Sequence, residues 1–178
     1  EISGSKITIG ATGNGNKGIS AATDITMISG NISIINSGNG ATYKNSTGVT
    51  DSYNATCLTA DRNISITGGS LTTNSSGTGG RGINADGTLT IGGINMSPTV
   101  HVTTTGTKFL ISGTGSAAEY CEAKAIKTDG AISIHSGTIT VSSADDGIKS
   151  KTSVTINGGD TKIKNSVEGI EAPFITMN

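Results

Sequence analysis

The sequence predicts an all-β protein that folds as a right-handed parallel β-helix, with about 22 residues in each coil and two insertions. Three observations predict this class. Ile, Thr and Val are frequent while the usual helix formers are scarce, which favours strands. A short phrase recurs along the chain, and an alternating apolar triplet follows every copy of it. The 178 residues are expected to form a single domain, residues 1–178.

The recurring phrase places one apolar residue between small or polar neighbours. The intervals between these apolar residues are 39, 25, 43, 22 and 22. The last two intervals define the basic unit, and the longer ones contain insertions. The six copies are Gly18–Ala21, Cys57–Ala60, Gly82–Ala85, Ala125–Thr128, Gly147–Ser150 and Gly169–Ala172.

Two further short strands are expected after each phrase, because period-two alternation directs one face inward and the other outward. The second strands are Ile25–Met27, Ile64–Ile66, Leu89–Ile91, Ile132–Ile134, Val154–Ile156 and Ile175–Met177. Glycine corners follow at Gly30, Gly68–Gly69, Gly92–Gly93, Gly137 and Gly158–Gly159. The third strands are Ile32–Ile34, Leu71–Thr73, Ile139–Val141 and Thr161–Ile163.

Stacked coils, about 4.8 Å apart, would place equivalent side chains in ladders. Three ladders are apolar: Ile19/Leu58/Ile83/Ile126/Ile148/Ile170, Ile25/Ile64/Leu89/Ile132/Val154/Ile175 and Met27/Ile66/Ile91/Ile134/Ile156/Met177. A fourth is small in every coil: Ala21/Ala60/Ala85/Thr128/Ser150/Ala172. The right-handed sense follows the general preference of parallel crossovers. An antiparallel β-sandwich is the competing interpretation, but it does not require the same residue type at the same place in every unit.

Two insertions, residues 38–56 and 97–124, interrupt the period and contain all three tyrosines. Within the second, Val100–Val102 and Phe109–Ile111 are expected to form an extra hairpin on the coil stack. The chain stops at Asn178 within a coil, so we expect the domain to be incomplete at its C-terminal end.

Composition excludes several function classes. A net charge of −1 offers no basic surface for nucleic acid. No apolar run approaches the length of a membrane span. Cys57 and Cys121 lack zinc-site spacing, and either a disulfide or two buried thiols is compatible with them. The motifs of a nucleophile elbow, an HExxH metalloprotease and a phosphate-binding loop are all absent.

Outward ladders gather charge in the last coils. Lys127, Lys149 and Glu171 follow the phrase's apolar residue and are interpreted as a contact for acidic or hydroxylated sugars, the alternative being a solvated face. Tyr43, Tyr53 and Tyr120 are the available stacking residues for a sugar ring.

Several carboxylates lie close together if the coils stack in register. Carboxylates one coil apart repel unless a cation lies between them, and calcium prefers such oxygen ligands. The expected calcium ligands are Asp145, Asp146, Glu168 and the nearby Asp129. The alternative is that Asp-Asp-Gly is simply turn chemistry. A polysaccharide lyase would need Lys149 or Lys127 as a base beside such a cation.

The phrases at residues 80–93, 124–130, 145–149 and 166–171 resemble those of a bacterial family of secreted carbohydrate-binding proteins related to a clostridial cellulose- and pectin-binding protein. The resemblance implies a β-helix similar to that of polysaccharide lyases, bound calcium, and binding of cellulose-like or acidic polysaccharide at the cell surface without catalysis. The expected function is therefore extracellular, non-catalytic polysaccharide binding. A lyase acting on uronate glycans and a structural cell-surface adhesin remain the alternatives.

Overall fold

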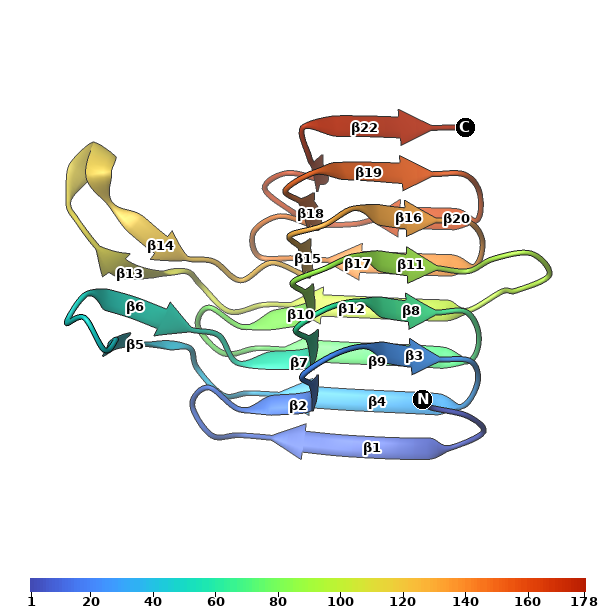
Figure 1. Ribbon diagram of the computed structural model, residues 1–178, viewed down its shortest axis with the longest axis horizontal. Helices are drawn as coiled ribbons and strands as arrows, with labels where there is room; N and C mark the ends of the chain where they lie inside the picture. Colours follow the sequence, from blue (N-terminus) through green and yellow to red (C-terminus); the bar gives the residue numbers. More distant parts are fainter.

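The computed structural model describes residues 1–178 as three six-stranded parallel sheets stacked around one core (Figure 1). We number the three sheets in chain order. The chain passes through sheets 1, 2 and 3 in turn and returns to sheet 1 one coil higher. Every coil strand pairs in parallel with the equivalent strand of the next coil, for example β7 with β10 and β10 with β15. The parallel β-helix is therefore confirmed, and the antiparallel sandwich is wrong.

The strands are short and equivalent from coil to coil. Sheet 1 contains β1 (Lys6–Ala11), β4 (Asn31–Asn36), β9 (Ser70–Ser75), β12 (Thr99–Thr104), β17 (Thr138–Ser142) and β20 (Asp160–Ile163). Sheet 2 contains β2 (Lys17–Ala21), β7 (Thr56–Ala60), β10 (Arg81–Ala85), β15 (Ile126–Thr128), β18 (Ile148–Ser150) and β21 (Ile170–Glu171). Sheet 3 contains β3 (Ile25–Met27), β8 (Ile64–Ile66), β11 (Leu89–Ile91), β16 (Ile132–Ile134), β19 (Ser153–Ile156) and β22 (Phe174–Met177).

The core is a stack of aliphatic ladders. The three predicted apolar ladders pair in register, and the small ladder does so from Ala21 to Ser150. Most apolar members of these ladders form a cluster of 24 buried residues with the inward side chains of sheet 1, whereas Ile175 and Met177 in the last coil are exposed. Each fully buried aliphatic side chain contributes about 1.5–3 kcal/mol, so repetition of one small unit builds a stable interior without aromatic rings.

The corner between sheets 3 and 1 depends on glycine. The sequence predicts glycine at this corner, and the structure has Gly30, Gly69, Gly92, Gly137 and Gly159 there in successive coils, all with positive φ. At Gly69, with φ of 77°, an added Cβ would also lie 2.5 Å from the carbonyl oxygen of Gly30. Only glycine combines this conformation with such close stacking.

Two coil strands, β1 and β12, were not predicted from the sequence. β1 pairs with β4 and adds a coil strand before the first repeated phrase. β12 pairs with both β9 and β17, so Val100–Val102 belongs to sheet 1 and the prediction that it forms a hairpin with Phe109–Ile111 is wrong. The loop of residues 93–98 separates β12 from its corner glycine, which hides the repeat in the sequence.

The hairpins themselves project from one corner of the stack, between sheets 1 and 2, at the left of Figure 1. One is β5 (Ala41–Lys44) with β6 (Thr50–Tyr53). The other is β13 (Phe109–Ser112) with β14 (Glu119–Cys121), joined through a short 3-10 turn, η1 (Gly115–Ala117). Cys57 in β7 and Cys121 in β14 are buried free thiols and form no disulfide. No helix long and apolar enough to cross a bilayer is present.

Candidate functional site: the charged face of sheet 2

Sheet 2 carries two neighbouring columns of polar side chains. One lies on its outward face, because alternation along each strand sends every second residue outward. The other lies at the corner where the chain enters the sheet, and three of its members, Thr56, Lys124 and Asp146, are buried. In the last three coils, those of β15, β18 and β21, every member is charged. The strand column consists of Ser20, Thr59, Asn84, Lys127, Lys149 and Glu171. The entry column, where the chain enters sheet 2, consists of Lys17, Thr56, Arg81, Lys124, Asp146 and Glu168.

Lys124 is the centre of the entry column. Its Nζ donates to Glu122 Oε2 and Asp145 Oδ2 at 2.7 Å each, and also to Asp146. The Lys124 side chain is only 9% exposed. Desolvation lowers the pKa of Lys124, but the hydrogen bonds to these three carboxylates outweigh it and hold the pKa above its usual value. The ammonium therefore supplies a positive charge that the stacked carboxylates require.

The strand column is paired in the same way. Lys127 and Lys151 both donate to Asp129, and Lys149 pairs with Glu171. Although desolvation raises it, the hydrogen bonds from the two lysines hold the pKa of Asp129 below its ordinary value. Asp129 is thus engaged by lysines at the corner after β15 and stands apart from the carboxylates of the entry column.

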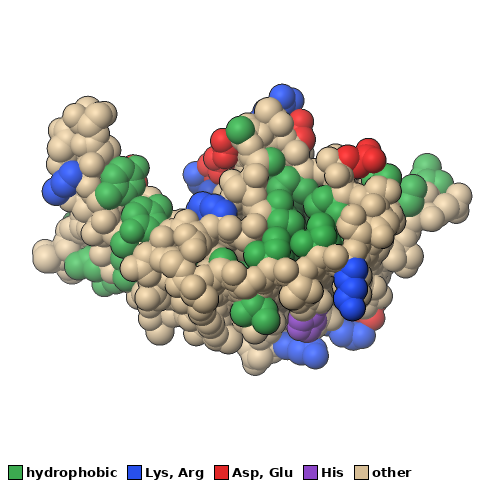
Figure 2. Space-filling model, turned by 90° about the horizontal axis from the view of Figure 1, so that it is seen from below, with side chains coloured by type: hydrophobic (Ala, Val, Ile, Leu, Met, Phe, Trp, Pro, Cys, Tyr) green, Lys and Arg blue, Asp and Glu red, His purple; other side chains and the backbone are tan.

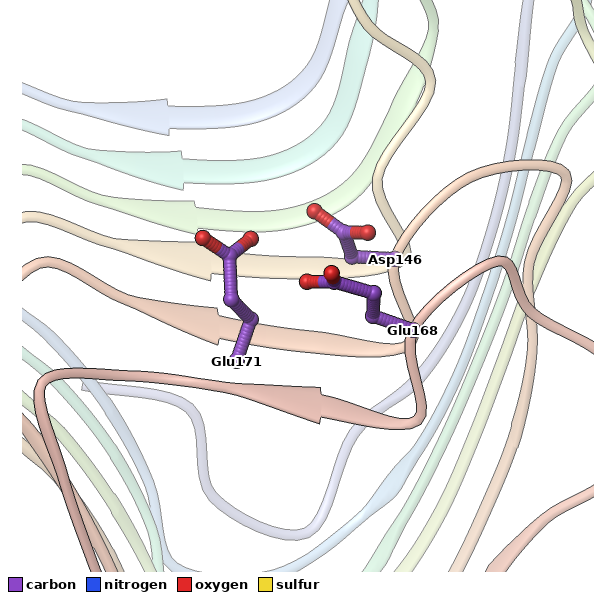
Figure 3. A group of neighbouring side chains, drawn as sticks. All are labelled: Asp146, Glu168 and Glu171. Carbon is purple, nitrogen blue, oxygen red and sulfur yellow. The ribbon is translucent and has the colours of Figure 1, made fainter.

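One group of carboxylates has cation-binding geometry. Oxygen atoms of Asp146, Glu168 and Glu171 lie within 4.8 Å of one another, and Figure 3 shows the three carboxylates converging. Ca²⁺ binds oxygen at about 2.3–2.6 Å, so ligands on opposite sides of one ion are about 5 Å apart. The spacing therefore permits a shared ion. Asp146 and Glu171 already contact lysines, whereas Glu168 forms no ion pair.

This group differs in membership from the set that the sequence suggests. Glu171 joins Asp146 and Glu168, while Asp145 contacts Lys124 and Asp129 contacts Lys127 and Lys151. The difference arises because the direction and reach of each side chain decide which carboxylates converge, and sequence register alone does not define them.

The tyrosines lie on the hairpins. Tyr43 and Tyr53 stack on each other with ring centroids 6.2 Å apart. Tyr53 packs over Gly15 in the first coil, so this pair is not brought to the charged last coils. Tyr120 lies on β14, with the Lys108 Nζ 4.5 Å from its ring centroid.

Lys108 connects Tyr120 with the charged face. It lines a crevice of about 300 Å³ together with Gly106, Thr107, Ala144, Asp145 and Val167. The crevice therefore presents the Lys108 ammonium and the Asp145 carboxylate, and the Tyr120 ring lies against that ammonium outside the crevice lining. Such a combination suits a sugar, whose hydroxyls need polar partners and whose ring needs a flat apolar face. Lys108 could not be recognised as a site residue from the sequence, because it lies in an insertion outside the repeat.

The fold and this face define a class of protein: a parallel β-helix with a charged, aromatic-flanked surface suited to a polar ligand. A family model described as "Carbohydrate-binding domain-containing protein" matches residues 93–169, which is 77 of the 178 residues. The match is to less than half of the chain, but it includes every residue that lines the crevice. No curated protein and no solved structure gives a significant match.

Proposed function

We propose that the protein is a non-catalytic, extracellular polysaccharide-binding protein. The observation that carries the proposal is the match of a carbohydrate-binding family model to residues 93–169, the segment that contains the crevice, Lys124, Lys127 and Lys149. The ligand is a cellulose-like or acidic polysaccharide at the cell surface. It lies over the crevice and the charged end of sheet 2.

The residues available there match the chemistry of a glycan. Asp145 accepts hydrogen bonds from sugar hydroxyls, and Tyr120 offers the ring face that Lys108 does not cover. Lys108 and Lys149 offer ammonium groups to uronate carboxylates. Parallel coils about 4.8 Å apart repeat polar groups along one line, which suits an extended polymer.

Binding without catalysis is favoured by how the lysines are held. A lyase of uronate glycans needs a basic amine free to take a proton. Lys127 and Lys149, the two candidate bases, are each engaged with a carboxylate. They act in this proposal as fixed positive charges that orient the ligand.

Calcium is proposed as the accompanying cation, held by Asp146, Glu168 and Glu171, whose all-oxygen donor set and 4.8 Å spacing suit this ion. Bound Ca²⁺ neutralises the three carboxylates and attracts anionic groups of a glycan. Because Lys124 and Lys149 already contact two of these side chains, binding requires the ammonium groups to shift or to share the carboxylate oxygens.

The test is affinity electrophoresis in gels containing polygalacturonate or a soluble cellulose derivative, with calcium or with a chelator. We expect retardation on at least one glycan. Lys149→Met and Lys108→Ala weaken it, whereas Lys162→Met, an exposed lysine on sheet 1, leaves it unchanged. Absence of retardation on both glycans contradicts the proposal, and release of unsaturated uronate product would instead identify a lyase. Equal retardation with calcium and chelator contradicts the role of calcium alone.

A further inference from the structure

Arg81, at the start of β10, is a cation without a carboxylate partner. Its Nη1 donates to Asn84 Oδ1 at 2.9 Å, and its Nε is buried with no acceptor. The Asn84 amide in turn donates to Asp86 Oδ1 at 3.2 Å, so Asp86 reaches the guanidinium only through this amide. An orphaned buried donor in a native protein needs a physical explanation, and a bound ion is one.

Lys17 stands in the same column two coils below Arg81. Its Nζ donates to the carbonyl oxygen of Asn54 at 2.7 Å, a neutral acceptor at the base of the β5–β6 hairpin. Neither Lys17 nor Arg81 takes part in an ion pair, whereas Lys124, Lys127 and Lys149 in the later coils all do. The two zones of the same face therefore differ in charge balance.

No carboxylate forms an ion pair with Arg81 or Lys17, although the charges of Asp129, Glu122 and Asp86 act on the guanidinium without direct contact. Desolvation and then the charge of Arg81 lower the pKa of Lys17, with only partial opposition from Asp86 and Asp61. Cys121 lies beside the guanidinium, but burial raises the pKa of its thiol, which stays neutral at physiological pH. Asn54 Nδ2 donates to Gly79 O and Cys121 Sγ, so this amide is also occupied.

The two cations lie where the hairpins join sheet 2. Lys17 contacts Asn54 immediately after β6, and Asn54 contacts Cys121 on β14. Figure 2 shows that the lobe formed by the hairpins, at the left, is separated from the coil stack by a hollow bordered by Lys or Arg and by Asp or Glu side chains. Lys17 is exposed and Arg81 is partly exposed, so a small anion has access from solvent to the ammonium and to the part of the guanidinium that is not buried.

We propose that Arg81 and Lys17 form an oxyanion-binding site for the carboxylate of an acidic sugar or for free sulfate or phosphate. The planar guanidinium offers parallel N–H donors to two oxygens of the anion, and the lysine supplies a second positive charge. Both residues belong to the first three coils of sheet 2 and lie outside the segment matched by the family model, so anion binding there is tested independently of the proposed polysaccharide surface in the later coils.

The test uses the side-chain Nε–Hε NMR signals of arginine in the intact chain. Arg62 and Arg81 are the only arginines, and Arg62 pairs with Asp24 on the exposed surface, so it serves as an internal control. Sulfate and galacturonate are titrated separately against chloride at constant ionic strength, with galactose as the neutral control. We expect a saturable shift of the Arg81 signal with at least one oxyanion, little change at Arg62, and no shift with galactose.

The variant Lys17→Gln keeps the Arg81 reporter and is expected to weaken oxyanion binding about tenfold, because one charge-assisted contact is lost. Lys6→Gln, in the same coil but on sheet 1, is the matched control and leaves binding unchanged. Tighter binding of galacturonate identifies an acidic sugar as the source of the oxyanion, and tighter binding of sulfate identifies a free anion. A silent Arg81 signal, an equal shift with galactose, or unchanged affinity in Lys17→Gln overturns the proposal.

Discussion

Replacing Lys124 by Met removes the positive charge at the centre of the entry column. Three carboxylates then lose their ammonium partner, and the Asp146 side chain is 6% exposed, so water cannot replace the lost contact well. Breaking a buried ion pair by removing one partner costs about 3–5 kcal/mol, because the other charge is left uncompensated. Asp145 and Glu122, at 20% and 37% exposed, are partly screened. We expect the free energy of unfolding to fall by about 3 kcal/mol.

The pH dependence of this effect follows from the direction of the shift. The pKa of Lys124 is higher in the folded protein than in the unfolded chain, since the carboxylate hydrogen bonds outweigh desolvation. The stabilisation is therefore complete below the unfolded pKa of about 10.4 and is lost as the pH rises through the folded pKa. The difference between wild type and Lys124→Met is expected to persist through neutral pH and to shrink only in strong alkali.

Urea unfolding monitored by circular dichroism measures the effect, with Lys162→Met as the matched control. Lys162 pairs with Asp160 at 2.6 Å, but the two side chains are 61% and 56% exposed. Such a pair is worth about 0–1 kcal/mol, so the control stays close to wild type. Adding Asp146→Asn to Lys124→Met is expected to recover part of the loss, since it removes the stranded charge. Equal unfolding midpoints for Lys124→Met and Lys162→Met would refute the reasoning.

Three further predictions concern packing, thiol chemistry and cation binding. Gly77→Ala is expected to lower the free energy of unfolding by about 3 kcal/mol, because the added Cβ would lie 1.9 Å from the carbonyl oxygen of Gly38; Gly10→Ala, which meets no atom within 4 Å, is the control in the same urea titration. Burial raises the pKa of Cys57 to about 12, so a thiol reagent is expected to label it only as the fold opens, and equal labelling rates in native buffer and in urea would contradict this. Lys124→Met is expected to show a larger rise in melting temperature with calcium than wild type does, since the ammonium no longer competes for Asp146; a smaller rise would argue against the cation site.

The ladders could be predicted because parallel stacking requires the same kind of side chain at the same place in every coil. Ile83, Ile126 and Ile148 pair directly, and their phrases are recognisable without any structure. β12 could not be predicted in the same way. Its residues alternate like any third strand, but a six-residue loop replaces the usual short corner, and the period no longer marks their place.

For the candidate site, the sequence predicts which residues share a column but not which side chains contact one another. Register alone places Lys124, Asp146 and Glu168 in one column, and the structure has them in the entry column. Which ammonium meets which carboxylate depends on side-chain rotamers and on the corner geometry. Asp129 is an example. It lies at the corner directly after β15, where Lys127 and Lys151 hold it, and it does not join the entry-column carboxylates.

The distribution of charge along sheet 2 has a consequence for how a long ligand would be held. In the later coils each lysine is balanced by a carboxylate, so recognition there relies on directional hydrogen bonds and changes little with salt. Arg81 and Lys17 have no ion-pair partner, so attraction there is electrostatic, depends on salt and selects anions. A neutral glycan would use only the first zone. An acidic glycan long enough to reach both would gain affinity from their linkage without any new contact, and would lose that gain first as the salt concentration rises.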